Sequence, residues 1–240
     1  MGFIKDKCIS ESAFYDTLCN YWYQIRIKII KSCCMKILIC SLIYGNRPHD
    51  ILASNLWRAG CPYDHANINT EGISNALNDG LDLALIDDYD YIGFLANDIL
   101  EPDNWLAKKL EALQTYPFAG IVASSLGDVR RAIKSEHIIS NWLIDIKLVK
   151  EIGYFNEAMF PYGPIDLDYC ERANIANFNT YYVMDCMAEH IGSHATGTEY
   201  GWNKSEILTK NWAAHQHDII SYRNGTKNIK HDKRTYNKEI

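Results

Sequence analysis

The sequence predicts an α/β fold, with a mixed, mostly parallel β-sheet flanked by helices. Between residues 36 and 124, short apolar runs typical of buried strands alternate with longer segments whose apolar residues recur at helical spacing. Parallel strands need crossover connections, which are usually helices, so this alternation predicts a mostly parallel sheet with right-handed crossovers. Asn97 and Asp98 follow the apolar run at 91–95, and that end of a strand is where α/β proteins place ligand-binding groups.

The first half of the chain carries the regular alternation. Residues 36–43 are an apolar run that predicts a buried strand, and turn residues at 44–48 predict a loop after it. The elements expected next, in chain order, are a helix at 49–59, a short strand within 63–69, a helix that starts within 69–80 and runs through Leu85, a strand at 91–95, a helix at 103–115 opened by Pro102, and a strand at 118–124.

The second half of the chain lacks the regular alternation of strands and helices. Residues 137–146 predict a strand or a strand pair. The elements expected after them are a short helix at 146–152 that ends at Gly153, an aromatic and proline-rich loop at 156–164, a helix at 166–176 with an acidic start, and a strand at 180–187. The tail from 222 is polar and basic, so we expect it to be mobile or to cover a surface.

Length and composition predict a globular chain with one α/β domain or two small ones. Of the 240 residues, 48% are hydrophobic and 22% are charged, which suffices for a core. We expect one domain at 35–221, an extension at 1–34 before it and the basic tail at 222–240 after it. The net charge of −6 is not the basic charge typical of nucleic-acid-binding proteins, so we expect no nucleic-acid partner. The net charge does not exclude a local basic groove.

The extension at 1–34 contains an apolar stretch, 21–31, that Arg26, Lys28 and Lys31 interrupt. It is neither a secretory segment nor a membrane span, because a span needs about 18 uncharged apolar residues. Two interpretations stay open for 21–31. It is either a basic amphipathic helix in peripheral contact with a membrane surface or, as we favour, part of an extension that packs loosely on the domain.

The eight cysteines are scattered, show no C-x-x-C spacing and often lie in apolar runs, as Cys40 does. Buried free thiols in a reducing compartment fit this pattern better than a disulfide framework or a zinc site, so we expect a cytoplasmic location. Three histidines, His194, His215 and His217, invite a zinc interpretation. His215 and His217 alternate as in a strand, but no cysteine or carboxylate stands at ligand spacing from them.

Three acidic or histidine clusters stand at predicted strand or helix ends. They are Asn97 with Asp98, Asp166 with Asp168, and His190 with His194. Taken singly, each has a structural explanation; the helix dipole alone, for example, favours two aspartates at a helix start. Their order within an α/β chain is what makes them informative.

Six segments carry a resemblance to a known family, across about residues 36 to 215. They are Asn46-Arg47-Pro48 after the first strand, the helix start at 69–80, the block Phe94-Leu95-Ala96-Asn97-Asp98-Ile99 with Pro102 and Trp105 behind it, the segment at 152–157, the helix start at 166–173, and His190-Ile191-Gly192-Ser193. In this order they resemble the signature segments of the glycosyltransferase family 2 group. The resemblance implies the Rossmann-like GT-A fold and sugar transfer from a nucleotide-diphosphate sugar.

The resemblance also implies where the donor and a divalent cation bind. Asp98 is the expected metal carboxylate, and His190 lies near the diphosphate or completes the metal shell, with Mg²⁺ or Mn²⁺ as the cation. Asn97 is expected to hydrogen-bond the ribose or a phosphate. The full set of residues expected to contact the nucleotide sugar is Asn46, Arg47, Asn69, Gly72, Asn75, Asn78 and Asn97.

The acceptor, a glycan or other hydroxyl compound, needs a general base, and Asp166 occupies that position of the family. Its place at a helix N-terminus is expected to keep it ionised. One base opposite the leaving group implies a single in-line displacement with inversion. We expect a structural or capping role for Asp168, and for Arg172 an ion pair or a contact that holds the loop. The aromatic residues Tyr162 and Trp142 suit stacking on the acceptor sugar as well as they suit the core.

The sequence departs from the family pattern at three points. Ala96 stands at the first position of the DxD-type block, Ile165 replaces the glutamate before the expected base, and the segment before Asn69 lacks the Asp-x-Ser turn. These departures keep a second hypothesis open, a non-catalytic nucleotide- or sugar-binding protein. A nucleotidyltransferase ranks last, because the loop at 44–48 has one glycine and one arginine instead of a glycine-rich basic phosphate loop. There is also no nucleophile elbow, GxGxxG or P-loop sequence.

Overall fold

The computed structural model describes residues 35–43, 50–126, 141–191 and 204–232. The chain divides between Met35 and Lys36, and the elements below belong to the second unit. Several sequence-based expectations concern residues outside the described ranges, namely the extension at 1–34 with its segment 21–31, the loop residues Asn46 and Arg47, and His194.

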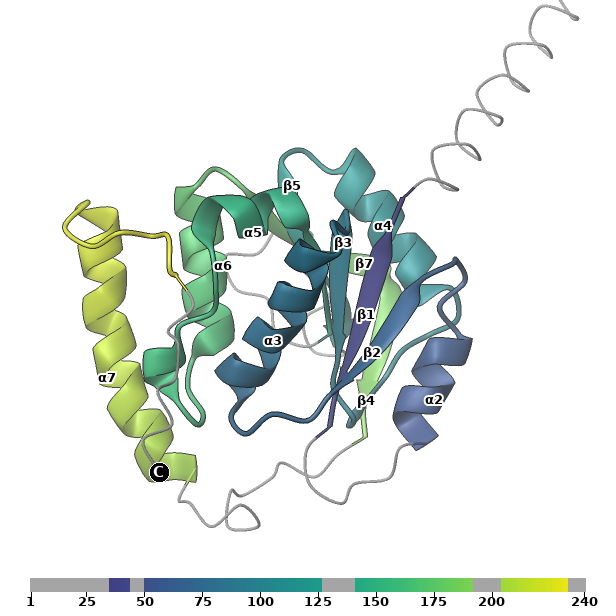
Figure 1. Ribbon diagram of the computed structural model, residues 1–240, viewed down its shortest axis with the longest axis horizontal. Helices are drawn as coiled ribbons and strands as arrows, with labels where there is room; N and C mark the ends of the chain where they lie inside the picture. Colours follow the sequence, from purple (N-terminus) through teal and green to yellow (C-terminus); the bar gives the residue numbers. More distant parts are fainter. Residues whose placement is uncertain (1–34, 44–49, 127–140, 192–203, 233–240) are drawn as a thin grey trace, which may run out of the picture. The chain divides into compact units, whose positions relative to one another are not determined.

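Among the described residues, seven strands form one sheet in the order β2-β1-β3-β6-β5-β7-β4 (Figure 1). Strands β1, β2, β3, β5 and β7 run in one direction, whereas β6 and β4 run antiparallel to their neighbours. The strands are β1 (Ile37–Leu42), β2 (Asp64–Ile68), β3 (Tyr91–Leu95), β4 (Ile99–Leu100), β5 (Ala119–Leu126), β6 (Trp142–Asp145) and β7 (Asn179–His190). The predicted α/β fold with a mixed, mostly parallel sheet is confirmed.

Helices cover both faces of the sheet. The main core cluster lies where the sheet meets α3 (Ile73–Ile86), α5 (Ile146–Ile152) and α6 (Ile165–Ile175). On the other face, α4 (Trp105–Thr115) packs on β5, β6 and β7 (Figure 1). Because both faces are covered, β1 is buried at every position.

The remaining elements complete the described part of the chain. They are α2 (Asp50–Trp57), a 3₁₀ turn at Glu157–Met159 and α7 (Lys204–Arg223). Within the described ranges, no helix is both long and apolar enough to cross a bilayer. The cysteines in these ranges, Cys40, Cys61, Cys170 and Cys186, are free thiols as expected.

The predicted strands and helices of the first half, and those at 146–152, 166–176 and 180–187, are confirmed in type. Most boundaries differ by one or two residues, and for two of the differences the structure shows the cause. Helix α4 begins at Trp105 instead of 103, because Asn104 adopts a left-handed conformation with φ 59°. Strand β7 continues to His190 instead of 187, because its end pairs with β4, a strand that the sequence did not predict.

The strand-like alternation of His215 and His217 is wrong, because both residues lie in α7. The sequence did not predict this helix. Its buried residues include Asn211, His215 and Tyr222, which share one face because they are four and seven residues apart. Two of these side chains are polar, so the helix lacks the apolar stripe by which amphipathic helices are recognised.

The beginning of the basic tail covers a surface of the domain. His231 forms a parallel bridge with Gly153. The backbone amide of His231 donates to the Ile152 carbonyl at 3.0 Å, and the His231 carbonyl accepts from the Tyr154 amide at 2.9 Å. His231 therefore attaches the tail to the segment that follows α5.

Candidate functional site

Polar residues gather at the edge of the sheet where β1, β2, β3, β5 and β7 have their carboxyl ends. Helix α3 begins at this edge because it follows the carboxyl end of β2. Helix α6 precedes β7, which starts at the opposite edge, so the first turn of α6 lies on the side of the carboxyl edge. In an open α/β sheet this is the ligand-binding edge. Of the predicted site residues within the described ranges, most lie here: Asn69, Gly72, Asn75, Asn97, Asp98, Asp166 and His190.

Asp98 and His190 are brought together by the short antiparallel pairing of β4 with β7. Ile99 of β4 lies opposite His190 of β7, and the Ile191 amide donates to the Asp98 carbonyl at 2.8 Å. The Asp98 Oδ2 atom lies 3.6 Å from His190 Nε2. Both side chains stay partly open to solvent, with exposed fractions of 24% for Asp98 and 34% for His190. The predicted metal pair therefore forms one partly exposed site with an oxygen donor and a nitrogen donor.

The turn that carries Asp98 is held from both sides by asparagine side chains. Asn141 Oδ1 accepts a hydrogen bond from the Ala96 amide at 2.7 Å. Asn55 of α2 donates to the Ile99 carbonyl at 2.7 Å and accepts from the Glu101 amide at 2.8 Å. The sequence analysis missed both asparagines. Their positions could have indicated a structural role, because Asn55 lies on the buried face of α2 and Asn141 directly precedes an apolar strand.

The carboxylate of Glu101, three residues after Asp98, is fully buried and ion-paired with Lys109 of α4, which is also fully buried. Lys109 Nζ lies 2.9 Å from Glu101 Oε1 and 2.9 Å from the Asn141 carbonyl oxygen. Asn141 Nδ2 donates to the same Glu101 oxygen at 2.9 Å, and the Ser124 hydroxyl donates to Oε2. A charged pair with this many partners satisfies the requirement for burying ions.

The start of α3 holds most of the residues predicted to contact the donor. Asn69 is exposed directly after β2, and Asn75 is half-buried in the first turn of α3, where its Nδ2 donates to the Glu71 carbonyl at 3.1 Å. Gly72 caps the helix with φ 84° and ψ 136°, a positive-φ conformation that glycine adopts without strain. A Cβ on Gly72 would lie 2.5 Å from the Phe160 ring. The start of α3 therefore lies against the loop at 156–164.

Asn78 makes a second connection between these two regions. It is fully buried. Its Oδ1 accepts from the Phe155 amide at 2.8 Å, and its Nδ2 donates to the Phe155 carbonyl at 3.1 Å and to Glu157 Oε1 at 2.9 Å. In this structure, the polar atoms of Asn78 therefore fix the segment that precedes the loop at 156–164.

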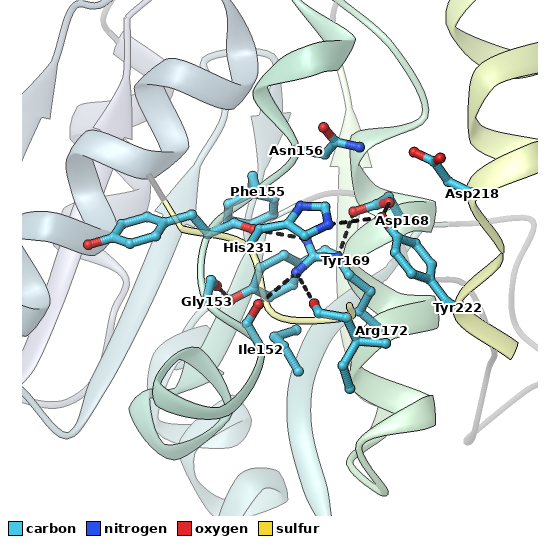
Figure 2. Close-up of polar contacts among 12 residues, drawn as sticks. Ile152, Gly153, Phe155, Asn156, Asp168, Tyr169, Arg172, Asp218, Tyr222 and His231 are labelled. Atoms are coloured by element: carbon cyan, nitrogen blue, oxygen red, sulfur yellow. Dashed lines mark hydrogen bonds and ion pairs between the residues drawn. The ribbon is translucent and has the colours of Figure 1, made fainter. Parts of the chain in front are cut away.

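Asp166 and Asp168 share the first turn of α6 but have different surroundings. Asp166 is half-buried at the ligand-binding edge, whereas Asp168 is fully buried. Arg172 Nε donates to Asp168 Oδ2 at 2.8 Å, and Tyr222 donates to Asp168 Oδ1 at 3.2 Å (Figure 2). The structural role expected for Asp168 is confirmed, which leaves Asp166 as the carboxylate of this turn nearer to solvent.

Arg172 makes the ion pair and holds the loop, as expected. Its guanidinium donates to the carbonyls of Ile152 at 2.9 Å, Tyr154 at 2.9 Å and Ile229 at 3.2 Å (Figure 2). Burial, and then the Arg172 charge, lower the pKa of His231 to about 4. The network of Asp168, Arg172, Tyr222 and His231 thus ties α6, α7 and the tail together.

The loop at 156–164 is held by Asn211 of α7. Its Nδ2 donates to the carbonyls of Met159 at 3.0 Å and Tyr162 at 2.7 Å. Trp142 is buried and stacks on Phe155 with 5.6 Å between ring centroids. The core interpretation of Trp142 is therefore confirmed, whereas Tyr162 is half-buried.

The pair Asp98 and His190 fits a divalent cation of the Mg²⁺ or Mn²⁺ class, because such ions are often held by one or two protein side chains with phosphate oxygens and waters at the other positions. The described residues contain no group of three or more His, Cys, Asp or Glu side chains arranged to hold a metal ion. A cation here would take its remaining ligands from water or from phosphate oxygens.

No model of a known protein family matches the sequence, and no curated protein matches it either. The fold, however, is similar to solved structures. A mannosyltransferase from Pyrobaculum calidifontis, in complex with GDP-Man and Mn²⁺, aligns with a TM-score of 0.54 and 13% identity over 66% of this chain and 57% of its own. The present chain therefore spans a little over half the length of that protein.

Two further structures are similar in the same way. GalNAc-T7 with UDP, GalNAc and Mn²⁺ aligns with a TM-score of 0.53 and 10% identity over 78% of this chain and 49% of its own. The catalytic domain of Drosophila β1,4-galactosyltransferase 7 with xylobiose aligns with a TM-score of 0.50 and 16% identity over 66% of this chain and 71% of its own. These likenesses show that the chain has the GT-A fold of glycosyltransferases.

Proposed function

We propose that the protein is a metal-assisted, inverting glycosyltransferase that moves a sugar from a nucleotide-diphosphate sugar to an acceptor hydroxyl. The observation that carries the proposal is the Asp98–His190 pair, 3.6 Å apart at the carboxyl edge of a GT-A sheet. A sugar transferase needs to stabilise the charge of a departing nucleoside diphosphate. A carboxylate and an imidazole at this edge are the kind of ligands that suit that task.

Asp98 Oδ2 and His190 Nε2 would hold the cation. When bound, Mn²⁺ or Mg²⁺ acts as a Lewis acid towards the diphosphate oxygens. The chain's own contribution is to present these two side chains at one place. Strand pairing does this, because the β4–β7 ladder fixes the backbone on both sides of the pair.

The donor would lie along the start of α3. Asn69 and Asn75 supply hydrogen-bonding groups there, and Asn97 precedes the proposed metal carboxylate. At Gly72 the backbone passes close to the loop at 156–164, which we place on the acceptor side. Any side chain at position 72 would clash with the Phe160 ring. Asn46 and Arg47 remain part of the proposed donor site on the basis of the sequence alone.

Asp166 would take the proton of the acceptor hydroxyl. It stands in the first turn of α6, where the helix dipole favours the ionised carboxylate. Asp168, the other carboxylate of that turn, is occupied by Arg172 and Tyr222. A single base on the acceptor side gives one displacement at the anomeric carbon, and hence inversion.

The proposal is tested with a panel of UDP-, GDP-, ADP- and dTDP-sugars read by thermal shift, with and without Mn²⁺. At a ligand concentration of about 100 times Kd, binding stabilises the folded protein by about 2.7 kcal/mol, which corresponds to a rise in Tm of roughly 5 °C or more. We expect one donor to give such a shift with Mn²⁺ and a smaller shift without it. The Asp98→Ala variant should lose the Mn²⁺-dependent part.

Turnover separates the two roles. With the donor identified, Asp166→Asn should bind donor as tightly as the unmodified protein but release or transfer sugar at least about 100-fold more slowly, which is the typical size of a general-base contribution. If both Asp98→Ala and Asp166→Asn kept full turnover, the assigned roles would be wrong. Absence of any nucleotide-dependent shift across the panel would reject the function itself.

A non-catalytic nucleotide- or sugar-binding protein is the second candidate, favoured by two specific positions. Ala96 offers no carboxylate at the first place of the metal block, and Ile165, before the expected base, is buried with 3% exposure. This candidate predicts a nucleotide-dependent shift in Tm together with no transfer to any of a broad panel of acceptors.

A further inference from the structure

A buried ionic cluster lies beside the turn that carries Asp98, and sugar transfer has no direct use for it. We call it the Glu101 cluster. Its members are Glu101, Lys109, Ser124 and Asn141, whose exposed fractions are 0%, 0%, 0% and 2%. The Lys109 ammonium also lies over the Trp105 ring, 4.8 Å from its centroid. Opposite charges are therefore enclosed together, away from water.

Stability alone is a weak explanation for such a cluster. A buried ion pair is often no more stabilising than apolar residues of the same volume, because both ions lose their hydration. The pair and its two partners come from four separate segments of the chain, since Glu101 follows β4, Lys109 lies in α4, Ser124 lies in β5 and Asn141 precedes β6. Cys186 of β7 adds a weak contact at 3.8 Å from Glu101 Oε2.

The cluster reaches the metal site through one side chain. Asn141 Nδ2 donates to Glu101 Oε1 at 2.9 Å, which orients the amide so that its Oδ1 accepts from the Ala96 amide at 2.7 Å. Ala96 is two residues before Asp98, and Glu101 is three residues after it. The Glu101 cluster therefore holds the Asp98 turn at both ends, through Asn141 before Asp98 and through Glu101 after it. Asn55 adds two hydrogen bonds to the same segment.

Fixing the backbone of the Asp98 turn matters more here than in a site where two carboxylates hold the cation. Because Ala96 stands at the first position of the metal block, Asp98 is the carboxylate that this turn contributes to the proposed cation site, opposite His190. The fewer ligands the protein supplies, the more their placement must be fixed before the cation arrives. Partners that orient a metal ligand typically change metal affinity 10–100-fold when they are removed.

We propose that Asn141, oriented by the Glu101–Lys109 pair, is a positioning residue that sets the Asp98 turn for cation binding. The proposal rests on the proposed function, because it takes Asp98 and His190 as the cation site. Asn141 itself is buried and belongs to the support beneath that site.

The test uses the Asn141→Leu variant, in which the side chain keeps its approximate volume and loses both polar ends. Two readouts apply. The first needs no metal, and follows amide hydrogen exchange at Ala96 and Ile191 by NMR. The second is the dissociation constant of Mn²⁺ alone, followed by electron paramagnetic resonance of the free ion. We expect exchange at both amides to accelerate at least about tenfold, and the Mn²⁺ dissociation constant to rise about 10–100-fold.

Val149→Ala is the matched control, because it removes buried volume from α5, away from the turn. It should lower Tm while leaving Ala96 exchange and Mn²⁺ binding within about twofold of the unmodified protein. Asn55→Ala is a second route to the same turn, should Asn141→Leu not fold, and it should weaken Mn²⁺ binding in the same direction.

Each outcome decides a different claim. If the unmodified protein binds Mn²⁺ and Asp98→Ala abolishes this, but the asparagine variants bind it normally, the positioning role is overturned and the proposed function stands. If amide exchange accelerates while Mn²⁺ affinity is unchanged, the role is likewise overturned. If the unmodified protein binds no Mn²⁺, the metal-assisted function fails, and the positioning role fails with it.

Discussion

Tyr222 and His231 share a hydrogen bond of 2.9 Å between the phenol oxygen and the imidazole Nε2 atom. The same phenol donates to the buried Asp168 carboxylate. Burial and the negative charge of Asp168 raise the pKa of Tyr222, whereas burial and the positive charge of Arg172 lower that of His231. Because the phenol hydrogen goes to Asp168, His231 Nε2 donates to the phenol oxygen (Figure 2). The low pKa means that the buried imidazole is neutral near pH 7.

This gives a pH dependence of stability. The pKa of His231 is about 4 in the folded protein and 6.5 in its ordinary state, so between these values the unfolded chain binds more protons than the folded one. Stability should therefore fall as the pH drops from 6.5 towards 4, by about 3 kcal/mol from this residue.

Urea denaturation of the unmodified protein and of His231→Gln at pH 7 and at pH 4.5 measures the effect. Glutamine keeps a polar group opposite Tyr222 and does not titrate, so the variant should lose less stability on acidification. An equal loss in both proteins would show that other groups dominate.

The close approach of Gly72 to Phe160 predicts that adding one methyl group at position 72 strongly lowers the free energy of unfolding. In Gly72→Ala, the alanine would have to keep a positive φ, and its Cβ would lie only 2.5 Å from the Phe160 ring, which would have to move. We expect a loss of roughly 2–4 kcal/mol, about 1–2 of it from the backbone conformation.

Gly225→Ala is the control, because Gly225 also has a positive φ, 68°, but nothing lies within 4 Å of its Cβ position. It should show the backbone cost alone, roughly 1–2 kcal/mol. Equal losses in the two variants, measured by urea denaturation, would mean that the Phe160 loop moves aside freely.

The Glu101–Lys109 pair should show strong coupling. Lys109→Met leaves a buried carboxylate without its counter-charge, and we expect a loss of about 3–5 kcal/mol. The double variant Glu101→Gln with Lys109→Met removes both charges and should recover most of that loss. The free energies of unfolding of the two single variants and the double variant form a cycle, and additive losses would contradict a direct pair.

Ala96→Asp should strengthen cation binding. It adds a carboxylate at the carboxyl end of β3, two residues before Asp98, while the backbone amide of residue 96 keeps its bond to Asn141. We expect the Mn²⁺ dissociation constant to fall about tenfold, because affinity for such ions rises with the number of charged ligands.

Thr115→Asp adds the same charge at the end of α4 near the opposite edge of the sheet, and should leave Mn²⁺ binding unchanged. If both variants bound Mn²⁺ more tightly by the same factor, the gain would come from net charge and not from the site.

The sequence predicted those features that depend on local pattern. Strand β1 and helix α3 were found because their apolar residues follow one period over a whole element. Asp98 and His190 were paired through the order of the motifs, since neither has a local feature that points to the other. The structure adds the ladder that brings them together.

The supports beneath the site could not be predicted in this way. Asn141 bonds to partners 45 and 40 residues away, Ala96 and Glu101, and such contacts leave no periodic trace in the sequence. Helix α7 was missed for a related reason. Its contacts to the loop and to α6 come from polar side chains, Asn211 and Tyr222, so hydrophobic periodicity does not reveal it.

The two outer strands of the sheet affect how the protein behaves in concentrated solution. Strand β4 is only two residues long, and β2 exposes Asp64, His65 and Asn67 along its short length. An open strand edge can template the addition of strands from another molecule, and short or charged edges discourage it. The sheet is thus poorly suited to grow by β-addition, and preparations of the domain should resist aggregation through its edges.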